Sequence, residues 1–133
     1  MKNKFVLCLT FLIVLSIIGL GEDNWLNQGA ALRAEGKYDD ALEAFEKSIE
    51  LNPENSLPWY YKGIIYSDQM KYDEALQSIE KAIELNPQLD IAWYNKGSVL
   101  KELGRDSEAV AALGKFAELL CDRFSTEHKA MQP

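Results

Sequence analysis

Apolar positions along most of the chain recur with helical spacing. From Ala75 to Ile83 they fall at i, i+1, i+4, i+7 and i+8, the stripe of an amphipathic helix. The stretch before it, from Trp59 to Tyr66, has near-helical spacing of its own. Asn86-Pro87 ends the later stretch, because the residue before proline avoids helical dihedral angles. No stretch alternates with a period of two, so the sequence predicts an all-α protein.

The helical pattern repeats along the chain with a period of 34 residues. Trp25, Trp59 and Trp93 are separated by that interval. One pair of helices cannot bury its apolar face alone, so three units are expected to stack into a right-handed α-solenoid. The other positions that keep the interval are Gly29, Gly63 and Gly97; Ala41, Ala75 and Ala109; Tyr38 and Tyr72; Phe45, Ile79 and Leu113; and Pro53 and Pro87.

The repeated glycines predict close contacts between helices. Gly29, Gly63 and Gly97 lie in the middle of expected helices, where glycine costs about 1 kcal/mol relative to alanine. Their presence in all three units indicates that a neighbouring helix approaches closely at this point. The large Trp and Phe/Ile/Leu positions are expected to fill the space beside them.

Polar residues suited to helix starts recur at fixed places in the repeats. Ser56 and Asp90 are expected to cap the helices that follow them, and Pro58 suits a first turn. Glu43 and Lys47 form an i, i+4 ion pair worth a few tenths of a kcal/mol. Acidic pairs near the second helices favour the positive end of the helix dipole, so we interpret them as caps and not as a glycosidase pair or a calcium site. These pairs are Asp39-Asp40 and Asp73-Glu74.

These repeated positions resemble the tetratricopeptide repeat, whose 34-residue unit has Trp, Gly, Tyr, Ala, Phe and Pro at set positions. The resemblance covers residues 22–121 and implies helix-turn-helix repeats at 22–55, 56–89 and 90–124. In this family the first helix of each pair lines a concave groove that holds extended or helical peptides. The matching residues are Trp25, Gly29, Gly36, Tyr38, Ala41, Phe45 and Pro53; Trp59, Gly63, Tyr66, Tyr72, Ala75, Ala82 and Pro87; and Trp93, Gly97, Gly104 and Ala109.

The third repeat departs from the family pattern in a way that predicts an extended last helix. Because Cys121 replaces proline, the helix is expected to continue through Phe124, before a polar tail at 125–133. No repeat follows, so Phe116 need not be small, and Phe116, Leu120 and Phe124 remain partly uncovered. Either the extended helix folds back to hide them, or they serve self-association or docking to a partner or a membrane.

Residues 1–21 differ in character from the rest of the chain. They contain Lys2 and Lys4 and no acidic residue, and residues 5–20 form an uncharged apolar stretch. This is typical of a secretory signal cut before Glu22, or of a short membrane anchor that forms a separate hydrophobic helix. Length and flanks favour cleavage. The protein is expected to be extracytoplasmic or secreted after cleavage, or membrane-anchored without it, with membrane contact through 5–20 at least during export.

Composition and motifs argue against several classes of function. The chain has 14 basic and 21 acidic residues, a net charge of −7 that disfavours nucleic-acid binding. His128 is the one histidine, and Cys121 lies at unhelpful spacing from it, so no metal, cofactor or catalytic site is predicted. Cys121 is expected to be a small buried or half-buried hydrophobic side chain. The sequence has no phosphate loop and no nucleophile elbow, so we expect a non-enzymatic protein.

The resemblance places the candidate binding residues on the first helix of each repeat. Tyr60 and Tyr94 would act as rigid amphipathic anchors. The chain is therefore expected to be an adaptor or scaffold that binds a peptide or helix of another protein, or else a structural module that self-associates. The candidate groove residues are Leu26, Ala30, Arg33, Leu57, Tyr60, Ile64, Ser67, Ile91, Tyr94, Ser98 and Lys101.

The resemblance also argues against one specific ligand. Family members that bind chaperones hold a C-terminal carboxylate with a clamp of Lys, Asn and Arg side chains. None of the matching positions here is positively charged, so we expect no clamp and a preference for apolar or aromatic side chains. These positions are Leu26, Ala30, Tyr61, Ile91 and Asn95.

Overall fold

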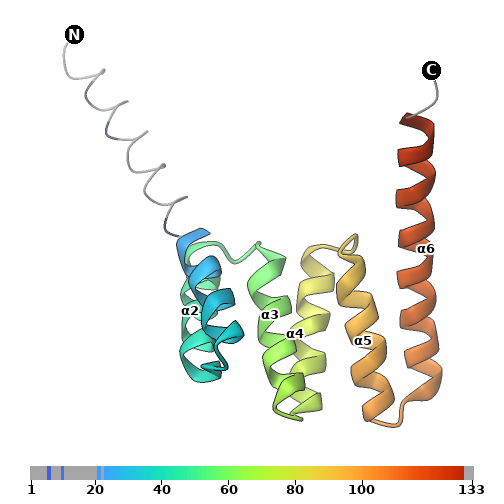
Figure 1. The fold of residues 1–133 in the computed structure, drawn as a ribbon, viewed down its shortest axis with the longest axis horizontal. Coiled ribbons are helices and arrows are strands. Elements are labelled where there is room, and N and C mark those ends of the chain that lie inside the picture. Colours follow the sequence, from blue (N-terminus) through green and yellow to red (C-terminus); the bar gives the residue numbers. More distant parts are fainter. Residues whose placement is uncertain (1–5, 7–9, 11–20, 22, 131–133) are drawn as a thin grey trace. The chain divides into compact units, whose positions relative to one another are not determined.

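The computed structural model describes residues 6, 10, 21 and 23–130 of the chain (Figure 1). Every regular element among them is helical, as predicted. The expected signal or anchor at 1–21 lies outside the described residues, apart from three isolated positions. Within the part of the chain that is described, no helix has both the length and the apolar character to cross a membrane.

The chain divides into two compact units, at 1–54 and 55–133. The first unit contains a helix over 23–34 and α2 (Tyr38–Leu51), joined by a short turn. In the second unit each helix packs on the next, and α5 also contacts α3 (Figure 1). The helices of the second unit are α3 (Ser56–Asp68), α4 (Tyr72–Leu85), α5 (Asp90–Glu102) and α6 (Asp106–Ala130).

The core of the second unit joins two helix pairs. Ile79 of α4 and Leu100 of α5 are fully buried in one cluster, and Trp93 packs against it while remaining partly exposed. Apolar burial of this kind contributes about 25 cal/mol per Å² removed from water. The stripe from Ala75 to Ile83 that predicted α4 therefore faces its neighbours on both sides.

The predicted close contacts at the mid-helix glycines are confirmed in both units. A Cβ atom at Gly29 would lie 2.6 Å from Phe45 Cε1, and one at Gly63 would lie 2.6 Å from Ile79 Cγ1. At Gly97 it would lie 2.7 Å from Leu113 Cγ. In each repeat the first helix thus lies against the large apolar side chain of the second, as the 34-residue spacing indicated.

The turn inside each repeat needs a left-handed residue. Gly36 and Gly104 take φ values of 77° and 71°, and Met70 takes 61° at the corresponding place in the second repeat. The backbone N–H of the next residue then bonds back into the helix, as from Lys71 to the Tyr66 carbonyl at 2.8 Å. Met70 adopts this conformation at a steric cost that glycine avoids.

The structure corrects the predicted helix caps. Asn55 caps α3, where its side chain accepts a 3.0 Å bond from the Leu57 N–H, while Ser56 is buried as the first helical residue. Asp90 also lies inside its helix, although its carboxylate accepts from the Ile91 N–H at 2.7 Å. Asn55 is the last residue before the helix, so its side chain can accept a hydrogen bond from a first-turn N–H that has no partner within the helix.

The acidic pairs lie at the positive ends of their helices, as expected, but they do not cap them. They lie in the first turns of α2 and α4, which begin without any side-chain cap bond. They therefore interact favourably with the helix dipole and not through a capping hydrogen bond. The pairs concerned are Asp39-Asp40 and Asp73-Glu74.

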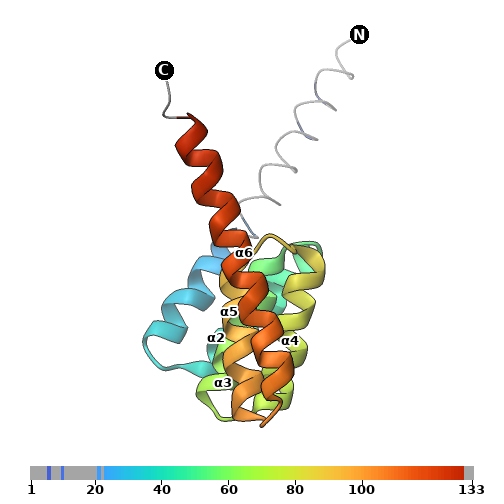
Figure 2. The same ribbon diagram turned by 90° about the vertical axis from the view of Figure 1, so that its right-hand side faces the viewer.

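The last helix continues far beyond the end of the third repeat. α6 has 25 residues against 14 in α4, and it continues through residues 125–130, which the sequence assigned to a polar tail. Figure 2 shows its second half extending past the other helices of the unit. The helix does not fold back: Phe124 is 65% exposed, whereas Phe116 and Leu120 are half-buried. The predicted extension through Phe124 is confirmed.

We expect Gly63→Ala to lower the free energy of unfolding by about 1–3 kcal/mol, because the new methyl meets Ile79 Cγ1 and, at 3.2 Å, the Ala75 carbonyl oxygen. Urea denaturation of the full chain measures the change. Gln77→Ala, at an exposed position of α4, is the control and should change stability by less than about 0.5 kcal/mol. Equal effects of the two substitutions would contradict the contact.

Candidate functional site

The candidate groove residues of the second unit lie on α3 and α5, which are in contact. Leu57, Ile91 and Tyr94 are 37%, 40% and 45% exposed, an unusual accessibility for side chains of this size. Ser98 and Lys101 are exposed too, and the others are half-buried. We call this set the α3–α5 surface; it comprises Leu57, Tyr60, Ile64, Ser67, Ile91, Tyr94, Ser98 and Lys101.

A hydrogen bond joins the two helices beneath this surface. The Asn95 amide donates to the Tyr60 hydroxyl at 3.1 Å and to the Ile91 carbonyl at 2.9 Å. The Tyr60 ring also lies at a tilt beside Tyr61, with 5.4 Å between ring centroids. Tyr60 is therefore held in one orientation, as a preformed binding surface requires. The sequence had singled out Asn95 only as a position without positive charge.

The structure brings together two sets of residues that the sequence treated separately. Tyr94 of the α3–α5 surface packs on Phe116 of α6, with ring centroids 5.4 Å apart at 56°. Tilted pairs of this kind add about 0.5–1.5 kcal/mol beyond their buried area. Phe116 thus supports the α3–α5 surface from the side, while Leu120 and Phe124 lie further along α6. The sequence contained no local signal for this pair, which spans 22 residues.

The remaining candidate residues belong to the first unit. Leu26, Ala30 and Arg33 lie along the 23–34 helix at intervals of one turn, and all three are half-buried. They therefore share one side of this helix, as residues three or four apart do.

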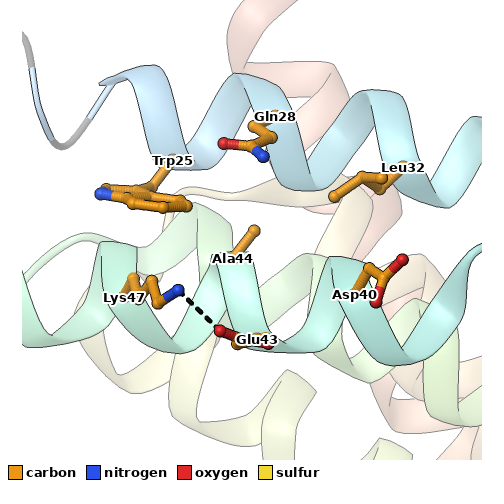
Figure 3. A pocket seen from close by; sticks show the side chains of 7 residues that line it. All are labelled: Trp25, Gln28, Leu32, Asp40, Glu43, Ala44 and Lys47. Atoms are coloured by element: carbon orange, nitrogen blue, oxygen red, sulfur yellow. Dashed lines mark hydrogen bonds and ion pairs between the residues drawn. The ribbon is translucent and has the colours of Figure 1, made fainter.

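The first unit also has a pocket of about 280 Å³ between the 23–34 helix and α2 (Figure 3). Lys47 lies at one end, with its ammonium 4.5 Å from the centre of the Trp25 ring and 2.6 Å from Glu43 Oε1. Asp40 adds a second carboxylate along α2. The sequence predicted the Glu43–Lys47 pair, which is confirmed, but not the pocket. The other residues that line it are Gln28, Leu32 and Ala44.

Each repeat tryptophan has a lysine ammonium over its ring, but the lysine comes from different positions. Lys62 and Lys96 reach Trp59 and Trp93 from the same helix, at 5.3 and 5.7 Å. In the first repeat Gln28 occupies that place, and Lys47 of α2 supplies the charge instead. Such contacts are worth about 0.5–1 kcal/mol at exposed sites. The Gln-for-Lys change was the sequence signal that could have identified the pocket.

Ion pairing perturbs the titration of four surface groups. The hydrogen bond from Lys47, together with its charge, lowers the pKa of Glu43, and Glu35 raises the pKa of Lys37 in the same way. Arg105 donates to Glu108 at 2.7 Å twice, which lowers the pKa of Glu108 and raises that of Arg105. All of these groups are exposed, so their effect on stability is small.

The described residues contain no cluster of three or more His, Cys, Asp or Glu side chains that would hold a metal ion. Cys121 is exposed, contrary to the expected half-buried position, because α6 continues past it with no element over that side. The α3–α5 surface presents apolar and aromatic contact area at Leu57, Ile91 and Tyr94.

Models of one protein family match most of the described chain. One model, described as tetratricopeptide repeat, matches residues 23–55 and 57–89. A second model with the same description matches residues 78–111. No curated protein matches the chain.

Several solved structures have the same fold. MamA aligns with a TM-score of 0.75 and 23% identity over 78% of this chain and 61% of MamA, so the chain spans less than two thirds of that protein. The second TPR of Spaghetti (RPAP3), bound to the HSP90 peptide SRMEEVD, gives 0.72 and 25% over 75% and 87%. The TPR2B domain of yeast Sti1, in a pHsp70 complex, gives 0.72 and 18% over 75% and 80%. These likenesses confirm the predicted fold class.

We expect Lys47→Met to raise the pKa of Glu43 toward its ordinary value of 4.5, because the lysine provides both the bond and the charge that lower it. A carboxyl group whose pKa is lower in the folded state stabilises the fold at pH values above its unfolded-state pKa. This stabilisation is lost as the pH falls through the folded-state pKa. The difference in Tm between wild type and variant should therefore narrow below about pH 4.5. Carbon-detected NMR titration measures the pKa. Lys81→Met, which removes the partner of Glu84, is the control and should leave Glu43 unchanged.

Proposed function

The chain belongs to the tetratricopeptide repeat family, and we propose that it is a non-enzymatic adaptor that holds a peptide or helix of another protein on the α3–α5 surface. The observation that carries the proposal is the exposure of Leu57, Ile91 and Tyr94 on helices that also hold Tyr60 in place. Interfaces obtain most of their binding energy from a few such apolar and aromatic anchors.

Similar structures support a protein partner. The Spaghetti and Sti1 domains are described as complexes with chaperone peptides. The chemistry of this chain points to a different peptide class. Ile91 and Asn95 occupy positions where a carboxylate clamp has Lys and Arg, and the Asn95 amide already donates to Tyr60 and to a backbone carbonyl. An acidic peptide end would find Lys101 as the one cation of the α3–α5 surface.

The proposed setting is outside the cytoplasm or at a membrane. The basic start and the apolar run at 5–20 carry this part of the proposal. A cut before Glu22 would release the repeats directly, because the first described helix is continuous from residue 23. Without the cut, the first repeat would begin almost at the bilayer.

Panning random displayed peptides on the full chain is expected to enrich apolar and aromatic sequences. Ile91→Ser and Tyr94→Ser should each weaken a selected peptide by about tenfold or more, measured by fluorescence polarisation, because each removes an exposed anchor. Gln77→Ser, at an exposed position of α4, is the control and should bind as wild type. The peptide SRMEEVD should not bind at micromolar concentration; binding there, or variants that bind normally, would refute the proposed surface.

The intact mass of the native protein from fractionated cells tests the setting. We expect a species that begins at Glu22 in the exported fraction, or the full-length chain in the membrane fraction. A full-length chain in the soluble cytoplasmic fraction would refute both routes.

A further inference from the structure

α6 carries a face without a single charged residue. Positions 110, 113, 117, 120 and 124 of this face follow one another at alternating intervals of three and four residues, which is the seam of a helix that packs against another helix. Val110 is 70%, Phe124 65% and Leu113 38% exposed, Leu120 is half-buried, and the rest are exposed. We call this set the α6 face; it comprises Val110, Leu113, Gly114, Ala117, Leu120, Cys121 and Phe124.

The repeat itself shows what kind of element covers such a face. The residues of α4 at the same places in the repeat are buried to 6%, 0% and 8% exposure, in a core shared with α5. A helix therefore covers these places in the second repeat, whereas in the third they stay apolar and open. The pairs one repeat apart are Leu76 and Val110, Ile79 and Leu113, and Ile83 and Ala117.

Gly114 shows that the α6 face has been shaped for close approach. α2 and α4 have Glu46 and Glu80 at this place, and Glu80 pairs with Lys96 of α5 at 2.8 Å. A Cβ at Gly114 would meet no atom within 4 Å, so packing within the described chain does not require this glycine. Glycine disfavours a helix, but its missing side chain would let a second backbone come near.

The first repeat is poorly suited to cover the α6 face of another copy. The side of α5 that covers α4 includes Ala92, fully buried, and Leu103. The first repeat has Asn24 and Glu35 at these places, and both are exposed. A polar outer face is what a capping repeat presents to water. Open head-to-tail stacking through this face is therefore disfavoured against a closed symmetric contact.

We propose that the α6 faces of two copies pair in antiparallel fashion about a twofold axis at Ala117. In this register two large side chains of each helix meet smaller residues of the other, and the exposed Phe124 and Val110 form an apolar pair. Phe124 lies opposite Val110, and Leu120 lies opposite Gly114. Leu113 lies opposite Cys121. The pairing is self-complementary in size, so one helix serves as both knob and hole.

The opposite side of α6 is held in place by its own chain, which presents the face on a fixed element. Leu119 is buried within the second unit, and Phe116 packs on Tyr94. Arg123 forms an ion pair with Asp90 at the start of α5, which ties the extension to the repeat. Dimerisation thus needs no rearrangement of α6 and leaves the α3–α5 surface free to bind a partner.

Sedimentation velocity of the full chain in mild detergent over a concentration series tests the proposal. Wild type should dimerise, and Gly114→Glu should weaken the dimer by about tenfold or more, because the carboxylate would be buried without a partner. The monomer should keep its fold and melt no earlier, since glutamate favours the helix over glycine and its Cβ meets no atom within 4 Å. Ala111→Glu, which adds the same charge at an exposed place outside the α6 face, should dimerise as wild type.

Two results overturn the proposal. One is a wild type that stays monomeric, which is also the result if the α6 face binds a helix of a different protein. The other is a Gly114→Glu chain that associates as wild type, which would place the contact elsewhere, such as in residues 5–20.

Cross-linking tests the antiparallel register. In a chain with Cys8→Ser and Cys121→Ser, Ala117→Cys should form a disulfide-linked dimer under mild oxidation, because the axis places residue 117 opposite itself. Native Cys121, tested with Cys8→Ser alone, should not, because it lies opposite Leu113. Rapid linkage through Cys121, or none through Ala117→Cys, overturns the antiparallel arrangement.

Discussion

Each helix pair of this protein depends on one contact, between a glycine of the first helix and a large apolar side chain of the second. The nearest atoms leave no room for even a methyl group at Gly63, where Ile79 lies 2.6 Å from the place of the missing Cβ. Because one side of the first helix is committed to this contact, its other side is free to face outward. The exposure of Ile91 and Tyr94 follows from that commitment, since both lie on the helix that Gly97 seats against Leu113.

Equivalent positions serve different purposes according to their neighbours in the stack. Leu76 is buried beneath α5, and its equivalent Val110 is exposed, although both are apolar and lie at the same place in a helix. The lysine that lies over the repeat tryptophan likewise comes from different helices. In the first repeat Gln28 stands at the place of that lysine, and Lys47 of α2 lies over Trp25 instead. The repeat therefore specifies the geometry of a position, and the surroundings decide whether it contributes to a core, a surface or an interface.

Two surfaces of the second unit have separate physical requirements. The α3–α5 surface needs exposed anchors held rigidly, which the bond from Asn95 to Tyr60 and the packing of Tyr94 on Phe116 provide. The α6 face needs an uncharged seam with room for a second backbone, which Gly114 provides. α6 connects them: it supports the first surface on one side and forms the second on the other. The proposed partner-binding surface and the proposed dimer contact thus share one helix.

The sequence alone determined the helical content, the period, the glycine contacts and the ends of α2 and α4 at Asn-Pro, because these depend on spacing and on backbone chemistry within a few residues. Only the tertiary structure decided that Asn55 and not Ser56 caps α3, that Cys121 is exposed, and that Tyr94 meets Phe116. Burial and contact depend on which distant segments cover a residue. A helical pattern states which side of a helix is apolar, but not whether anything packs against it.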